Sequence, residues 1–114
     1  MKMFTDKIDS NVTLIKLIGR MDIQGAEEID IKFSGTTAVN NGIFIVDLSG
    51  VEFLASIGIR SILVTAKAVV ARKGQLVLCS PTPLVAGVLE MAGISAIIPV
   101  FDNFEDARSA ITLS

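Results

Sequence analysis

Few side chains in this 114-residue sequence could carry chemistry, and most of them lie between positions 22 and 79. Asp22, Asp47 and Ser49 supply carboxylates and a hydroxyl, Ser56 supplies a second hydroxyl, and Cys79 supplies a lone thiol. Such groups can act as bases, nucleophiles, metal ligands or phosphate acceptors. The chain has no histidine, so it cannot assemble a Ser-His-Asp or Cys-His catalytic set. We therefore expect no enzymatic turnover, no metal and no cofactor.

The composition restricts the cellular compartment and the kinds of partner that we expect for this protein. A single cysteine excludes an internal disulfide and suits a reducing compartment. The net charge of −2 argues against nucleic acid as a partner, because phosphate binding needs clustered Lys and Arg and the longest basic cluster is Arg72-Lys73. The longest uncharged stretch, 74–89, falls short of the about 20 apolar residues of a membrane span. The N-terminus meets Asp6 too early for a signal peptide, so we expect a cytoplasmic protein without membrane insertion.

The elements that would position these side chains alternate between strand and helix. The first two strands should form a hairpin through the turn residues Asp9-Ser10-Asn11. Helices separate the later strands, which should therefore be parallel. The pattern predicts a single α/β domain over 1–114, with a mixed, mostly parallel sheet of four to five strands and about four helices. We expect strands at 3–8, 12–18, 43–46, 76–79 and 96–100, and helices at about 23–35, 56–73, 84–91 and 104–111.

Three elements have more specific predictions. The apolar run 43–46 should be a strand near the centre of the sheet, covered on both faces. Pro99 should put the last strand at an edge, since proline cannot donate to a ladder. Gly74 should cap the long central helix at its C-terminus. The apolar stripe that this helix should pack on the sheet comprises Ile59, Ile62, Leu63, Ala66 and Val70.

The sequence also predicts which residues begin the helices. Thr82 and Asn103 should cap helices, and Pro83 suits a first helical position. Ser56 is expected to be an N-cap contributing about 1 kcal/mol. Gly58 in the first turn costs roughly 1 kcal/mol against Ala, which indicates either a tight turn or close approach by a partner.

The segment 45–59 carries a family resemblance. Its motifs are Asp47-Leu48-Ser49, Phe53-Leu54 and Ser56-x-Gly58, and Gly19-Arg20-Met21-Asp22 adds a further match. With the order of elements, these motifs resemble the STAS domain of anti-sigma factor antagonists over nearly the whole chain. The resemblance departs at Ala55, where the family usually has Asp, and at Ile57, where it usually has Ser or Thr.

The resemblance implies a phosphorylation-regulated binding switch. Ser56 would accept phosphate from a partner anti-sigma factor that is a serine kinase, and the unphosphorylated protein would sequester that anti-sigma factor and free a sigma factor. Ser49 should be engaged in its turn and Ser61 lies within a helix, so Ser56 is the preferred acceptor. The implied partner-binding residues are Phe53, Leu54, Ala55, Ser56, Ile57, Gly58 and Arg60.

Two alternatives stay open. Ala55 and Ile57 favour a scaffold subunit of a signalling or lipid-transport complex, without a phosphorylation cycle. Asp47 is expected to bond loop amides, yet Asp22, Asp47 and Ser49 are also candidates for a polar pocket, because open α/β sheets place sites at the carboxyl ends of strands. Either function is compatible with a homodimer.

Overall fold

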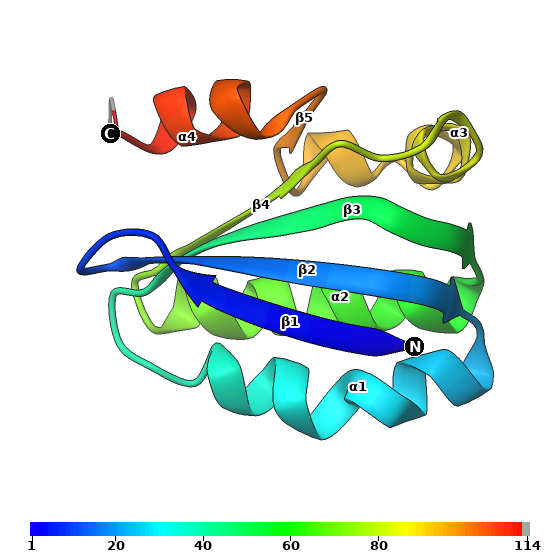
Figure 1. The fold of residues 1–114 in the computed structure, drawn as a ribbon, viewed down its shortest axis with the longest axis horizontal. Coiled ribbons are helices and arrows are strands. Elements are labelled where there is room, and N and C mark those ends of the chain that lie inside the picture. Colours follow the sequence, from blue (N-terminus) through cyan, green and yellow to red (C-terminus); the bar gives the residue numbers. More distant parts are fainter. Residues whose placement is uncertain (113–114) are drawn as a thin grey trace.

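Strands and helices alternate along the chain in the order that the sequence predicts. The computed structural model describes residues 1–112 (Figure 1). Its elements are β1 (Lys2–Lys7), β2 (Val12–Met21), α1 (Ile23–Thr36), β3 (Ile43–Leu54), α2 (Ser56–Ala71), β4 (Gln75–Cys79), α3 (Pro83–Met91), the 3-10 turn η1 (Ile94–Ala96), β5 (Val100–Phe101) and α4 (Phe104–Thr112).

The five strands form one sheet in the order β1-β2-β3-β4-β5. β1 and β2 pair antiparallel through a tight turn in which the Ile8 N–H donates to the Val12 carbonyl oxygen (3.0 Å). The remaining neighbours pair in parallel. The predicted mixed, mostly parallel α/β sheet and its N-terminal hairpin are confirmed.

Helices cover the two faces of the sheet unequally. α1 and α2 pack together on one face, α4 packs on the other against β3, β4 and β5, and α3 packs beside the end of β3 (Figure 1). Side chains alternate across the pleat of β3, so Phe44 and Val46 join the core under α1 and α2, while Ile45 joins the core under α4. The prediction of a central strand buried on both faces is confirmed.

β3 is much longer than the apolar run 43–46 that predicted it. It continues to Leu54 because β2 also continues, and Met21 lies opposite Leu54 in the parallel register. The pairing of β2 with β3 has two register irregularities, one between Lys16 and Ile18 and one between Gly19 and Arg20. At one of them a Cβ on Gly50 would lie 2.9 Å from the Ile18 side chain. The expected loop after Asp47 is therefore a strand.

Other boundaries differ for local reasons. On α2, Val69 is buried and Val70 is exposed, so the predicted stripe was wrong at its last position. Ile62 and Ala66 are buried as predicted, and Ile59 and Leu63 are half-buried against the core. Val69 continues the Ile62–Ala66 line because a helix completes two turns in about seven residues.

The C-terminal end of α2 also departs from expectation. Lys73, with φ of 63°, adopts the left-handed conformation that was expected of Gly74. Gly74 is instead required by packing, since a Cβ there would collide with the Gly42 carbonyl oxygen.

The last strand is short. Positions 94–96 form η1 and only Val100 and Phe101 are in β5, whereas 96–100 was predicted as a strand. Pro99 lies just outside β5, and its carbonyl oxygen accepts from the Leu78 N–H (2.9 Å). The edge position of β5 is confirmed.

Candidate functional site: the corner between β3 and α2

The candidate site is the corner where β3 ends and α2 begins. Only Ala55 separates the two elements, and its N–H donates to the Met21 carbonyl oxygen of β2 (3.0 Å). The Ala55 carbonyl oxygen accepts from the N–H groups of Gly58 (2.9 Å) and Ile59 (3.1 Å), which begins the helix. The corner is thus held by backbone bonds to both β2 and α2.

Ala55, rather than Ser56, is the N-cap residue of α2. Its backbone is extended (φ −91°, ψ 168°), and Ser56 is the first helical residue. The predicted N-cap role of Ser56 was therefore wrong by one position, and alanine has no side-chain acceptor with which to cap the helix. Sequence spacing could not locate this boundary because it depends on how far β3 extends.

The predicted partner-binding residues divide by exposure. Ser56, Ile57 and Arg60 are exposed, and Phe53 and Ala55 are half-buried. Ser56 and Arg60 are four residues apart on a helix, so their side chains share one face. Leu54 and Gly58 are buried and support the corner from inside.

Gly58 is explained by packing within the chain. A Cβ at this position would lie 2.8 Å from both Leu54 Cδ1 and Met21 Cγ, and 2.9 Å from the Met21 carbonyl oxygen. Of the two explanations that the sequence left open, this close approach favours the tight turn between β3 and α2.

Arg20 is a feature of the corner that was not singled out as a site residue. It lies opposite Phe53 in the β2–β3 register, and its guanidinium carbon is 4.4 Å from the centroid of the Phe53 ring. Its Nε lies 3.7 Å from Asp22 Oδ2. The Gly-Arg-Met-Asp motif was the available signal, but only the pairing of two distant strands reveals the contact.

Asp22 serves as the N-cap of α1. Its Oδ1 accepts from the Gly25 N–H (2.8 Å). This hydrogen bond lowers the pKa of the Asp22 carboxyl, and the Arg20 charge acts in the same direction against partial desolvation. The Asp22 carboxylate therefore caps the N-terminus of α1 and also forms an ion pair with Arg20.

Asp47 and Ser49 lie near the middle of β3, away from the corner and from Asp22. Asp47 Oδ1 accepts from the Ser49 N–H (2.8 Å), as expected for a carboxylate that bonds nearby amides. Asp47 pairs with Lys16 in the β2 register, and Asp22 lies six residues further along, roughly 20 Å away at about 3.3 Å per strand residue. The structure does not bring Asp22 and Asp47 into one polar pocket, because the carboxyl ends of β2 and β3 extend far beyond Asp47.

Cys79 lies beside Asp47 in the β3–β4 register and is fully buried. Burial raises the pKa of the Cys79 thiol to about 11, and the Asp47 charge adds to this effect while a hydrogen bond with Ser80 opposes it. The thiol is therefore protonated at neutral pH, in keeping with a small buried apolar side chain.

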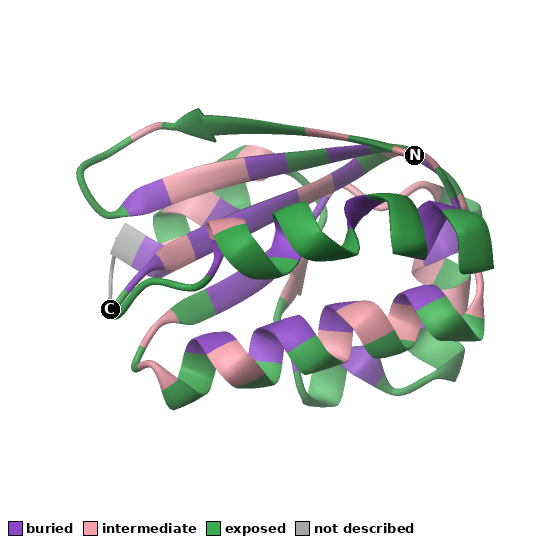
Figure 2. Cartoon of the chain, turned by 90° about the horizontal axis from the view of Figure 1, so that it is seen from below, coloured by how far each residue is buried: buried purple, intermediate pink, exposed green. Residues whose placement is uncertain are grey.

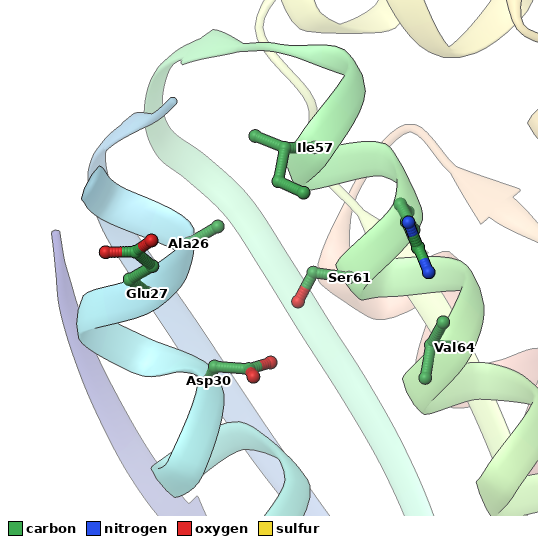
Figure 3. Close-up of a pocket in the computed structure, with 7 residues that line it drawn as sticks. Ala26, Glu27, Asp30, Ile57, Ser61 and Val64 are labelled. Carbon is green, nitrogen blue, oxygen red and sulfur yellow. The ribbon is translucent and has the colours of Figure 1, made fainter. Parts of the chain in front are cut away.

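A groove between α1 and α2 adjoins the corner (Figure 3). Its volume is about 280 Å³, and it shares Ile57 and Arg60 with the corner. Ser61 Oγ is buried and has no hydrogen-bond partner within residues 1–112. The groove is lined by Ala26, Glu27, Asp30, Ile57, Arg60, Ser61 and Val64.

Within the described residues 1–112, no three His, Cys, Asp or Glu side chains gather as metal ligands. Over the same range, no helix is both long and apolar enough to cross a bilayer. What the corner presents is an exposed hydroxyl at a helix N-terminus, flanked by an apolar side chain and by Arg60.

The fold and this corner define a STAS domain. The STAS family model matches residues 4–107, and the chain belongs to the STAS domain family. It is 31% identical over 110 residues to BtrV of Bordetella bronchiseptica, a candidate anti-sigma factor antagonist, covering 96% of this chain and 94% of that one.

Solved structures show the same fold at lower identity. An anti-sigma factor antagonist from Mycobacterium paratuberculosis is 20% identical, with a TM-score of 0.87 over 97% of this chain and 93% of its own. The Bacillus cell fate determinant SpoIIAA in its phosphorylated form is 21% identical, with a TM-score of 0.71 over 96% of this chain and 99% of its own. These likenesses confirm the predicted architecture over essentially the whole chain.

Proposed function

We propose that this protein is an anti-sigma factor antagonist that binds an anti-sigma factor through the β3–α2 corner and thereby frees a sigma factor. The observation that carries the proposal is the exposed Ser56 hydroxyl on the first residue of α2, between half-buried Phe53 and exposed Arg60. The relationship to the Bordetella protein over nearly both full lengths supports the same function. The proposed role is regulatory binding, and its setting is the cytoplasm, where sigma factors act.

Phosphorylation of Ser56 is the proposed control of this binding. A phosphoryl group adds about −1.5 to −2 charge at neutral pH. At the first helical residue it would lie at the positive end of the helix dipole, which tolerates negative charge. The fold should therefore survive the modification, while a partner docked on the corner would meet a new, strongly hydrated charge.

Two other hydroxyls are less suited to modification. Ser61 Oγ is buried inside the α1–α2 groove, so a kinase could not reach it without local opening. Ser49 is exposed, but its own N–H is bonded to Asp47 within a paired strand. A kinase binds its acceptor peptide with the backbone accessible, and the helix end at Ser56 meets that need better than a strand interior does.

The test uses the candidate anti-sigma kinase, ATP and phosphopeptide mass spectrometry. Label on Ser56, and weaker kinase binding by Ser56→Asp than by Ser56→Ala, are the expected results. Ser10→Asp is the matched control, since Ser10 is an exposed hydroxyl in the β1–β2 turn. A complete switch from 99:1 to 1:99 corresponds to about 5.5 kcal/mol of differential binding. Label on Ser49 or Ser61 would refute the site assignment.

Ala55 favours a second candidate, a STAS scaffold subunit without a phosphorylation cycle. It lacks the carboxylate that the family usually places before the regulated serine. Absence of label on any residue, together with equal partner binding by Ser56→Asp and Ser56→Ala, would support the scaffold over the switch.

A further inference from the structure

β1 leaves one edge of the sheet open along its whole length. It is the outermost strand, and its six residues are exposed except for half-buried Met3 (Figure 2). The opposite edge is β5, which has only two residues. An edge strand presents a row of N–H and C=O groups to any other extended chain. β1 is thus the longer free edge of this sheet.

The outward face beside this edge carries apolar side chains. Phe4 of β1 is 54% exposed and Ile18 of β2 is 37% exposed. They lie diagonally across the β1–β2 register, in which Phe4 is opposite Lys16 and Lys2 is opposite Ile18. α4 packs on this face mainly against β3, β4 and β5, and it leaves Phe4 largely exposed.

We propose that β1 pairs antiparallel with β1 of a second copy of this chain, so that Phe4 lies opposite the partner's Phe4. The pairing is two-fold symmetric and joins the two five-stranded sheets into one continuous sheet. Because residues directly opposite in an antiparallel pair lie on the same face, both exposed phenylalanine rings meet on the face that α4 leaves open.

Backbone geometry restricts the possible registers. Alternate residues of a strand direct their N–H and C=O groups to the same side, and opposite residues in a pair must match in this respect. For two identical strands, the numbers of opposite residues must therefore add to an even sum. Among such registers, only sums of 8 and 10 pair at least four β1 residues, and they centre on Phe4 and Thr5 respectively.

Charge selects between these two registers. Centred on Phe4, the pairing sets Lys2 opposite the partner's Asp6, and the symmetry repeats this opposite-charge pair. Centred on Thr5, it sets Phe4 opposite the partner's Asp6 and Met3 opposite the partner's Lys7. The first register brings together both the apolar rings and the opposite charges, and β1 is complementary to itself in that register alone.

Contacts within the chain already fix the start of β1 in position. The Met1 amino group is bound by Glu28 of α1, and Met3 packs against the core on the inner face. Ordering the strand on its own chain reduces the conformational entropy that dimerisation would otherwise have to remove. The pairing uses only the edge of β1 and does not depend on the phosphorylation of Ser56.

The test is a charge exchange read by sedimentation equilibrium and native mass spectrometry. Wild type should show a concentration-dependent dimer. Lys2→Glu places Glu opposite Asp6, and Asp6→Lys places Lys opposite Lys2, so each variant should weaken its own dimer by roughly tenfold or more. Mixing the two variants restores both opposite-charge pairs, so a heterodimer should form.

The control and the refuting outcomes are specific. Lys67→Glu on the exposed side of α2 makes the same charge change away from β1 and should dimerise as wild type does. Circular dichroism and thermal unfolding verify that each variant folds. A wild type that stays monomeric throughout the concentration series, or variants that fail to form a heterodimer on mixing, would overturn the proposal. Dimerisation unaffected by either β1 variant would equally overturn it.

Discussion

The Arg20 guanidinium carbon lies 4.4 Å from the centroid of the Phe53 ring, across the paired ends of β2 and β3. The Arg20 side chain is 58% exposed, so this cation–π contact should contribute about 0.5–1 kcal/mol. We expect Arg20→Gln to weaken binding of an anti-sigma factor by freeing the Phe53 ring near the end of β3. A double-mutant cycle with Phe53→Leu, read by calorimetric titration, measures the coupling. Additive effects of the two substitutions would contradict a joint role.

The cap of α2 can be tested by substitution. Ala55 has the extended backbone of an N-cap but no acceptor, so Ala55→Asp should stabilise the fold by about 1 kcal/mol in urea unfolding. Ser56→Ala should change the free energy of unfolding by no more than about 0.5 kcal/mol, because Ser56 is not the cap. The reverse ranking would show that Ser56 caps the helix in solution.

Gly58 and Gly87 provide a matched pair of helical glycines. A Cβ on Gly58 would press into Leu54 and Met21, so Gly58→Ala should destabilise the protein by about 1–3 kcal/mol. A Cβ on Gly87 in α3 would meet nothing within 4 Å, so Gly87→Ala should stabilise the protein by up to about 1 kcal/mol. Denaturant midpoints compare the two, and equal effects would contradict the packing argument.

The Asp22 cap predicts an acid-sensitive contribution to stability. The pKa of Asp22 is lowered below its ordinary value of 3.8, chiefly by the Gly25 N–H, so the folded state favours the ionised carboxylate. Its contribution is therefore present above pH 3.8 and is lost as the pH falls through the lowered value. Asp22→Asn keeps an acceptor but does not titrate, so its melting temperature should fall less on acidification than that of wild type. Parallel pH profiles would refute this linkage.

Cys79 should react slowly while the protein is folded. Its thiol pKa is raised to about 11 by burial, so little thiolate is available at neutral pH. Ellman's reagent should label Cys79 rapidly only in denaturant. The same shift predicts a contribution to stability that is complete below pH 9 and is lost as the pH rises toward 11. Rapid labelling of the folded protein would contradict the burial.

Local sequence chemistry predicted the elements whose determinants are local. Thr82 and Asn103 cap helices as expected, through bonds from the N–H groups of Val85 (3.3 Å) and Asp106 (2.8 Å). The predicted STAS family was likewise confirmed by the family match over residues 4–107. Hydrogen bonds within a few residues and short motifs are visible in sequence without knowledge of strand pairing.

The features that sequence reasoning missed depend on distant pairing. The length of β3, and with it the cap position of Ala55, follows from how far β2 runs beside it. The contact between Arg20 and Phe53 arises from the same register. Similarly, Ser61 Oγ is buried beside the groove between α1 and α2, and the residue pattern of α2 alone does not indicate that α1 packs there.

The unequal partnering of β3 has a consequence for local stability. β4 pairs only with the first half of β3, from Ile43 to Asp47, so the second half has β2 as its single hydrogen-bonded neighbour. Opening the end that carries the corner breaks one ladder, whereas opening the first half breaks two. Amide hydrogens near Leu54 can therefore exchange through a partial unfolding that leaves those near Ile45 protected. The end of β3 that carries the corner can therefore open locally while the centre of the sheet stays folded.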